Sequence, residues 1–235
     1  REALKLRRHI HLEPRVQGLQ PAAASRRFPS YLAPAMTQLP ELPLTLSRQE
    51  IRKMIRQRRR TLTPEQQQEM GQQAATRMMT YPPVVMAHTV AVFLSFDGEL
   101  DTQPLIEQLW RAGKRVYLPV LHPFSAGNLL FLNYHPQSEL VMNRLKIHEP
   151  KLDVRDVLPL SRLDVLITPL VAFDEYGQRL GMGGGFYDRT LQNWQHYKMQ
   201  PVGYAHDCQL VEKLPVEKWD IPLPAVVTPS KVWEW

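Results

Sequence analysis

The sequence is poor in cysteine and in long apolar runs. Cys208 is the only cysteine among 235 residues, so no disulfide can form within the chain, and we expect a protein of the reducing cytoplasm. No run reaches the roughly eighteen apolar residues of a membrane-spanning helix, and the first residues are too charged for a secretory signal. We therefore expect neither a membrane association nor a fold held by disulfides.

Basic charge is also scarce in most of the chain, although the formal net charge is +6. Seven of the 29 basic residues lie in residues 1–35 and another seven in residues 48–60, whereas the part after residue 60 is net acidic. A nucleic-acid-binding module that uses the arginine-rich segment is one interpretation. Because the acidic remainder would offer few phosphate contacts, we expect no nucleic-acid partner.

Residues 1–46 combine Pro, Ala, Arg and Leu without a sustained hydrophobic period. We interpret them as a disordered leader, tag or upstream extension. Residues 47–235 are long enough for one domain with a sizeable core, and we expect a single α/β domain that is a monomer.

Hydrophobic periodicity and capping residues predict alternating helices and strands in this domain. Helices are predicted at 48–60 after the cap Ser47, from Thr63 to before Pro82, from Asp101 to Trp110, and at 186–196. Strands are predicted at 90–96, 115–120, 129–134, 163–173 and 201–206. The near-continuous apolar run at 163–173 indicates burial on both faces, and the alternation is typical of an open, mostly parallel α/β sheet.

Glycine is scarce except in one loop. Five of the eleven glycines lie between residues 177 and 185, after the most apolar predicted strand and before a predicted helix. Backbone amides in such a loop can face an anion without obstruction by side chains, which predicts phosphate binding. The loop is not a Walker motif, because no Gly-Lys-Ser/Thr ends it. It also fails the dinucleotide fingerprint, because Phe186 stands where that pattern has Gly or Ala. A flexible surface turn is the alternative.

The segment from Arg179 to Asp188, Arg-Leu-Gly-Met-Gly-Gly-Gly-Phe-Tyr-Asp, resembles the Arg-x-Gly-x-Gly-x-Gly-aromatic-Tyr-Asp signature of bacterial 5-formyltetrahydrofolate cyclo-ligases. The order of elements resembles that family over residues 48–230. The resemblance implies a three-layer α/β/α fold of the type found in sugar-phosphate isomerases and CoA transferases. It also implies an enzyme that uses ATP and Mg²⁺ to convert 5-formyltetrahydrofolate into 5,10-methenyltetrahydrofolate, with release of ADP and phosphate.

The resemblance places the ATP phosphates on the glycine loop and Mg²⁺ on two aspartates, Asp188 and Asp220. Mg²⁺ prefers carboxylate and phosphate oxygens; the alternatives are a helix first-turn acid for Asp188 and a turn residue for Asp220. Arg179 and Tyr187 would be catalytic, and Tyr187 would also contact the substrate. The implied ATP-binding residues are Arg48, Arg52, Arg179, Gly181, Gly183, Gly184, Gly185, Phe186 and Tyr187. Many relatives carry Lys or Arg at the positions of Met182 and Gly184, so this loop depends more on its amides and on other arginines.

Arg48 and Arg52 match a basic pair of the family that contacts ATP. A spacing of four places both guanidinium groups on one helix face, where they can converge on a triphosphate. The alternative is a solvated basic helix, which is our interpretation of the remaining arginines of the segment, Arg56, Arg58, Arg59 and Arg60. A start at Met54 would delete the pair, so we expect translation to begin at Met36 or elsewhere upstream of Arg48.

The segment 93–102 resembles the family's folate-binding stretch and implies substrate contacts from Leu94 and Glu99. A carboxylate suits the pterin edge, which offers adjacent N–H donors; an acidic loop before a helix is the alternative. Asp101 is interpreted as the cap of that helix. Glu149 matches another family position near the folate. A sugar-phosphate isomerase or an acyl-CoA transferase on a similar sheet is the remaining alternative function, because fold does not fix function.

Overall fold

The computed structural model describes residues 46–235. The interpretation of residues 1–46 as a leader therefore lies, apart from Leu46, outside the described residues. The described part contains five α-helices: α1 Arg48–Arg60, α2 Pro64–Thr80, α3 Pro82–Met86, α4 Gln103–Arg111 and α5 Phe186–Leu191. None of the helices in this part is long and apolar enough to cross a bilayer.

A seven-stranded sheet forms the centre of the fold, in the order β12-β11-β9-β6-β1-β2-β3. The five central strands pair in parallel, whereas β12 and β3 run antiparallel to their neighbours at the two edges. The strands are β1 Thr89–Ala91, β2 Arg115–Leu121, β3 Leu129–Tyr134, β6 Val165–Thr168, β9 Gln200–Tyr204, β11 Ala225–Val227 and β12 Val232–Glu234. The predicted open, mostly parallel sheet is confirmed.

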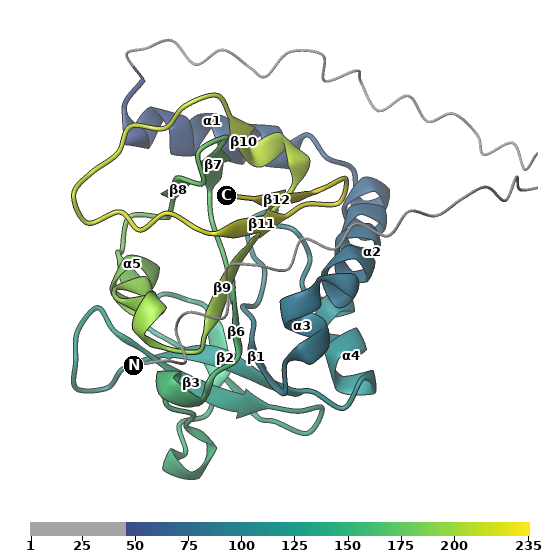
Figure 1. Cartoon of the computed structure of the whole chain (residues 1–235), viewed down its shortest axis with the longest axis vertical. Helices are drawn as coiled ribbons and strands as arrows, with labels where there is room; N and C mark the ends of the chain where they lie inside the picture. The colour runs from purple at the N-terminus through teal and green to yellow at the C-terminus, as the bar shows by residue number, and fades with distance from the viewer. Residues whose placement is uncertain (1–45) are drawn as a thin grey trace, which may run out of the picture. The chain divides into compact units, whose positions relative to one another are not determined.

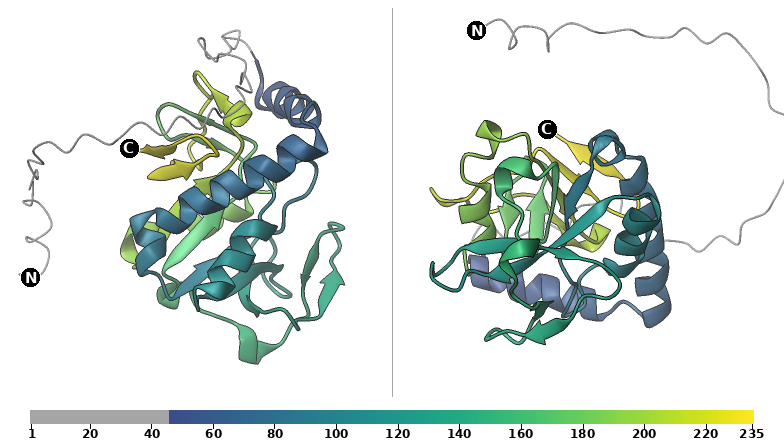
Figure 2. Two further views of the ribbon diagram at one scale, coloured as in Figure 1. Left: turned by 90° about the vertical axis from the view of Figure 1, so that its right-hand side faces the viewer. Right: turned by 90° about the horizontal axis from the view of Figure 1, so that it is seen from below.

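Helices cover both faces of this sheet and produce three layers (Figure 1). On one face, α2 and α4 lie side by side (Figure 2) and pack with α3 on alternate strand residues such as Val90 and Val165. On the other face, Ala91 and Leu166 belong to a second buried cluster with Leu191 of α5. Successive residues of one strand therefore enter opposite cores, which explains why the central strands are apolar throughout.

Two smaller sheets complete the described part. One consists of β7 Ala172–Asp174, β8 Arg179–Leu180 and β10 Leu210–Val211; the other is the hairpin of β4 Leu140–Met142 and β5 His148–Pro150. Neither small sheet was predicted, because strands of two or three residues are too short to show a hydrophobic period.

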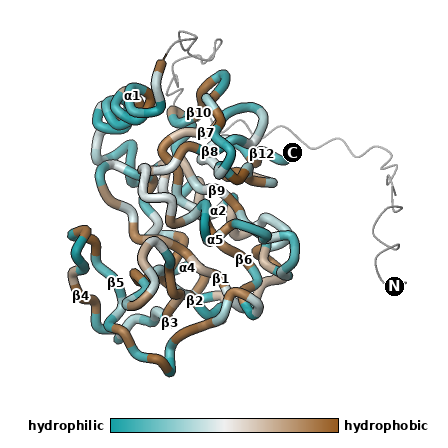
Figure 3. Tube along the Cα trace, turned by 90° about the vertical axis from the view of Figure 1, so that its left-hand side faces the viewer, coloured by the Kyte–Doolittle hydropathy of each residue, from teal (hydrophilic) through white to brown (hydrophobic). Residues whose placement is uncertain are grey.

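Helix α1 docks on the three-stranded sheet through two isoleucines. Ile51 and Ile55 are fully buried in a cluster with Val171, Leu180 and Val211. Their spacing of four places both side chains on one face, while the rest of the helix is largely hydrophilic (Figure 3). The docking fixes the arginines of α1 relative to the strands that carry the glycine loop.

One arginine of α1 departs from the prediction. Arg59 is only 3% exposed and packs against Gly98, so its interpretation as part of a solvated basic face was wrong. Position 59 follows Ile55 by four residues and therefore lies on the buried stripe of the helix.

The helix at 48–60, with its capping box from Ser47 and Glu50, and the strand at 129–134 are confirmed. The predicted single strand at 163–173 is wrong: Pro169, which cannot donate to a ladder, separates β6 from β7. The predicted helix at 186–196 ends at Leu191, because Asn193 adopts a left-handed conformation with φ 59°.

The predicted strand at 90–96 and the predicted helix from Asp101 to Trp110 differ from the structure in their bounds. The strand ends at Ala91. The helix, α4, has Thr102 at its N-cap position, while the Asp101 carboxylate accepts a hydrogen bond from the Gln103 amide at 3.0 Å. Asp101 thus contributes to the cap from one residue further out.

Replacing Ile55 with Ala should lower the free energy of unfolding by about 2–5 kcal/mol, since it removes three buried carbons and leaves a cavity under α1. Chemical denaturation of both proteins measures the change. Met86→Ala is the matched control, because Met86 is 80% exposed. An Ile55→Ala protein as stable as this control would contradict the role of the docking.

Candidate active site

A cavity of about 570 Å³ opens at the carboxyl ends of the central strands. Its lining includes Phe93 after β1, Leu121 at the end of β2 and Pro169 after β6. β1 lies between β2 and β6, so the path of the chain across the sheet reverses beside β1. Open α/β sheets bind their ligands in crevices at such reversal points.

The glycine loop forms one wall of this cavity, and it is not a free surface turn. Gly181 to Gly185 and Phe186 all line the cavity. Gly183 and Gly185 have φ of 108° and 71°, conformations that side chains with a Cβ rarely adopt. A Cβ at Gly184 would lie 2.8 Å from the Phe186 ring. The sequence of glycines is therefore required by the path of the loop.

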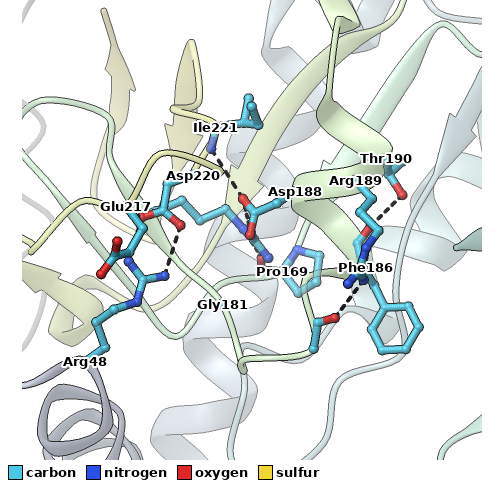
Figure 4. A network of polar contacts seen from close by, with 12 residues as sticks. Arg48, Pro169, Gly181, Phe186, Asp188, Arg189, Thr190, Glu217, Asp220 and Ile221 are labelled. Carbon is cyan, nitrogen blue, oxygen red and sulfur yellow. Dashed lines mark hydrogen bonds and ion pairs between the residues drawn. The ribbon is translucent and has the colours of Figure 1, made fainter. Parts of the chain in front are cut away.

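Two arginines of α1 reach this wall from the same helix face. The Arg52 Nε atom donates to the Gly181 carbonyl at 2.7 Å. Arg48 makes a two-pronged ion pair with Asp220, with distances of 2.6 and 3.0 Å (Figure 4). Since Arg48 and Arg52 both line the cavity, two cationic groups face the space in front of the glycine loop.

A third arginine lies beneath the loop. Arg179 is 6% exposed; its Nε atom donates to the Pro169 carbonyl at 2.8 Å, and its guanidinium lies 5.5 Å from the centre of the Tyr187 ring. Burial lowers the pKa of Arg179 and raises the pKa of the Tyr187 phenol, which therefore stays protonated. The pair offers a cation and a hydroxyl donor to one end of the cavity.

The two predicted metal ligands have different surroundings. Asp188 lines the cavity; its Oδ1 atom accepts from the Ile221 amide at 3.3 Å and lies 3.7 Å from Arg179, while no donor among residues 46–235 contacts Oδ2. Asp220 has both oxygens engaged by Arg48, and Oδ2 also accepts from the Glu217 amide at 2.8 Å. A cation at Asp220 would share the carboxylate with the Arg48 guanidinium.

Asp188 could be one ligand of a Mg²⁺ ion, but it would need further ligands from outside the protein. No group of three or more acidic, His or Cys side chains in the described part of the chain could hold a metal. Mg²⁺ commonly takes one or two carboxylates and completes its shell with substrate phosphates and water. The free oxygen of Asp188, beside the glycine loop, provides that kind of ligand.

The predicted substrate residues line the same cavity. Leu94, Glu99 and Glu149 all line the cavity. Glu99 is 9% exposed, its Oε1 atom accepts from the Phe96 amide at 3.1 Å, and burial raises its pKa to about 7. Glu149 accepts from the Leu121 amide and from Asn143 Nδ2, each at 3.0 Å. Both donors to Glu149 contact its Oε2 atom, so each glutamate keeps one carboxylate oxygen, Oε1 of Glu149 and Oε2 of Glu99, without a hydrogen-bond donor among the described residues.

Several lining residues were not predicted from the sequence. The hairpin β4–β5 contributes Leu145 and Ile147, and the loop before Asp220 contributes Trp219. Arg189 donates to the carbonyls of Gly184 at 2.8 Å and Gly127 at 3.1 Å, and so connects the glycine loop to the turn between β2 and β3. Trp219 and Ile147 had a sequence signal, since they stand next to Asp220 and two residues before Glu149. Arg189, which does not itself line the cavity, directly follows the glycine-loop motif.

Comparisons with known proteins place the chain in a family. Residues 45–229 match the 5-formyltetrahydrofolate cyclo-ligase family, a range that includes α1. The chain is 98% identical over 182 residues to the 5-formyltetrahydrofolate cyclo-ligase of Escherichia coli K12, covering 77% of the chain and 100% of that protein. It is 53% identical over 179 residues to the Haemophilus influenzae protein of that name, covering 76% and 96%.

Two solved structures have a similar fold. The NMR structure of Aquifex aeolicus 5,10-methenyltetrahydrofolate synthetase matches with a TM-score of 0.69 and 28% identity, over 80% of this chain and 93% of that one. A Mycoplasma pneumoniae 5,10-methenyltetrahydrofolate synthetase matches with a TM-score of 0.62 over 78% and 99%; at 20% identity it supports the fold alone.

Proposed function

We infer that this cavity is an active site in which both substrates meet, because the chain belongs to the 5-formyltetrahydrofolate cyclo-ligase family. The protein is an ATP-dependent ligase that converts 5-formyltetrahydrofolate into 5,10-methenyltetrahydrofolate. One observation supports this location. The glycine loop, Arg48 and Arg52, which are assigned to ATP, line the same cavity as Leu94 and Glu99, which are assigned to the folate.

The ATP phosphates bind at the wall of the glycine loop in this proposal. Arg48, Arg52 and Arg179 supply positive charge there, and the glycines allow the phosphates to approach the backbone closely. Arg48 and Arg52 compensate for the absence of a basic side chain at Met182 and Gly184. Asp188 would hold a Mg²⁺ ion, which would neutralise phosphate charge during transfer. Asp220 keeps Arg48 directed at the loop, and a metal contact by Asp220 stays a prediction.

The folate binds at the opposite wall. The free carboxylate oxygen of Glu99 accepts hydrogen bonds from the N–H groups of the pterin edge, while Leu94 packs against the ring. Because Glu99 is nearly buried, these hydrogen bonds form away from water, where they discriminate strongly between ligands. Glu149 is a further substrate contact in this proposal: Leu121 and Asn143 hold its Oε2 atom, and Oε1 is left for the folate.

The proposed reaction needs no covalent intermediate with the protein. The protein has to align the formyl oxygen of the folate with the γ-phosphate of ATP. The formyl oxygen attacks the γ-phosphorus, forming an O–P bond as the bond to ADP breaks. N10 next attacks the formyl carbon, its proton is lost, and the C–O bond breaks to release phosphate. Arg179 stabilises the charge on the transferred phosphoryl group, and the Tyr187 hydroxyl donates to an oxygen of it or of the formyl group.

The near-ultraviolet absorbance of methenyltetrahydrofolate tests the function directly. We expect it to rise when the protein is mixed with 5-formyltetrahydrofolate, ATP and Mg²⁺, and to stay flat when ATP or Mg²⁺ is omitted. A rise without ATP would contradict the proposed reaction. An isomerase or CoA transferase on this sheet would give no rise at all.

Replacing Asp188 with Asn should lower kcat by about 100-fold or more, because it removes the anionic ligand for Mg²⁺. Steady-state rates across a Mg²⁺ titration measure the loss, and the Mg²⁺ concentration for half-maximal rate should rise. Asp153→Asn is the matched control, since Asp153 pairs with the exposed Arg155 and does not line the cavity. Near-normal turnover of Asp188→Asn would refute the assignment.

The catalytic efficiency for the folate should depend on the ionisation of Glu99. Its pKa of about 7 means that the carboxylate becomes protonated as the pH falls below 7 and loses acceptor capacity. We therefore expect kcat/KM for 5-formyltetrahydrofolate to decline from pH 8 to pH 6. In Glu99→Gln the value should be lower and this decline absent, while Glu139→Gln, an exposed acid paired with Lys151, should behave like the unmodified protein. An unchanged decline in Glu99→Gln would assign it to another group.

A further inference from the structure

The last turns of α1 direct three arginines at a single carboxylate outside the cavity lining. The Asp97 carboxylate lies 3.1 Å from Arg60 Nη2, 3.6 Å from Arg59 Nη2 and 3.6 Å from Arg56 Nε. Positions 56, 59 and 60 share one helix face because they are spaced by three and four. We call Arg56, Arg59 and Arg60 the arginine clasp.

Asp97 belongs to a tight turn of four residues, from Phe96 to Glu99. The Glu99 amide donates to the Phe96 carbonyl at 3.1 Å, and the two central residues, Asp97 and Gly98, have φ of 52° and 74°. Positive φ at both central positions is the pattern of a type I′ turn. Asp-Gly is a favoured pair for these two positions, so the turn itself is locally stable, and the three arginines fix the Asp97 carboxylate on one side of it.

The same turn orients Glu99. Its Oε1 atom accepts from the Phe96 amide, so the first and last residues of the turn are joined by the side chain as well as by the backbone. The other carboxylate oxygen is left for the cavity that Glu99 lines. Any change in the position of Asp97 or Gly98 would therefore redirect the Glu99 carboxylate.

Burial makes Arg59 the central member of the clasp. Arg60 is 65% exposed on its side chain, and an exposed ion pair contributes little. Arg59 is nearly inaccessible, its Nε atom has no hydrogen-bond partner among the described residues, and it lies beside Gly98. A buried cation requires compensating negative charge, which Asp97 and Glu99 provide from one turn.

We propose that Arg59, with Arg56 and Arg60, is a positioning residue that acts through Asp97 to hold the Glu99 carboxylate in the folate half of the active site. The inference rests on the proposed function, in which Glu99 binds the pterin. It assigns a task to the arginine-rich end of α1 that neither ATP binding nor solvation explains.

Asp97→Gly tests the proposal with little risk to the fold, because glycine keeps the left-handed turn and loses only the carboxylate. We expect the KM for 5-formyltetrahydrofolate to rise about tenfold, as for the loss of a preorganised contact, with the KM for ATP within about twofold. Arg59→Gln should show the same split. Arg58→Gln, which removes a cation of the same helix whose contact is the Met54 sulfur, should leave both constants unchanged.

A double variant separates positioning from general loosening of the structure. If Asp97 acts through Glu99, then Asp97→Gly should add nothing to the KM of Glu99→Gln, because the carboxylate that it positions is already gone. Additive effects of the two substitutions on KM would overturn the proposed role of the arginine clasp alone. An unchanged KM in Asp97→Gly, beside a raised KM in Glu99→Gln, would do the same. An unchanged KM in Glu99→Gln would overturn the assignment of Glu99, and the clasp with it.

Discussion

The seating of α1 by Ile51 and Ile55 is the contact on which the rest of the site depends. Two apolar side chains fix the rotation of the helix on the three-stranded sheet, and that rotation decides where every arginine points. With the isoleucines inward, Arg52 reaches the Gly181 carbonyl and Arg59 is carried into the protein beside Gly98. The helix is hydrophilic in composition, but its position is set by hydrophobic burial.

Charge in the site is balanced locally. Arg48 faces Asp220, Arg179 lies near Asp188, and Arg59 lies near Asp97, so these three cations each have an acidic neighbour from a different segment. Arg52 instead donates to the Gly181 carbonyl. Such pairs add little net stability, because desolvation offsets much of the attraction. Their consequence is geometric: each pair allows a guanidinium to stay ionised close to the cavity, where the negative charge of a nucleotide would arrive.

The sequence predicted the parts of the site that lie on contiguous motifs. Glycine clustering is a local signal and predicted the phosphate loop, whereas Asp188 and the pair Arg48 and Arg52 were predicted from the family resemblance of contiguous segments; the structure brings all of them to one cavity. The parts that depend on contacts between distant segments were missed. Nothing in an arginine-rich run distinguishes Arg59 from its exposed neighbours until Ile51 and Ile55 define the buried stripe. The break at Pro169 was missed because apolar residues continue on both sides of it, although the proline itself was visible.

A single rigid helix connecting both halves of the cavity has a consequence for catalysis. From Arg48 to Arg59 the helix rises by about 16 Å, at 1.5 Å per residue, so its arginines are held at a nearly fixed separation. One end contacts the wall assigned to ATP and the other supports the turn assigned to the folate. The formyl oxygen and the γ-phosphate must approach within bonding distance from these two walls, and a small error in their spacing would cost rate steeply. A continuous helix that is docked by its own apolar stripe fixes this spacing. Two independent loops could each change conformation and would vary the spacing more.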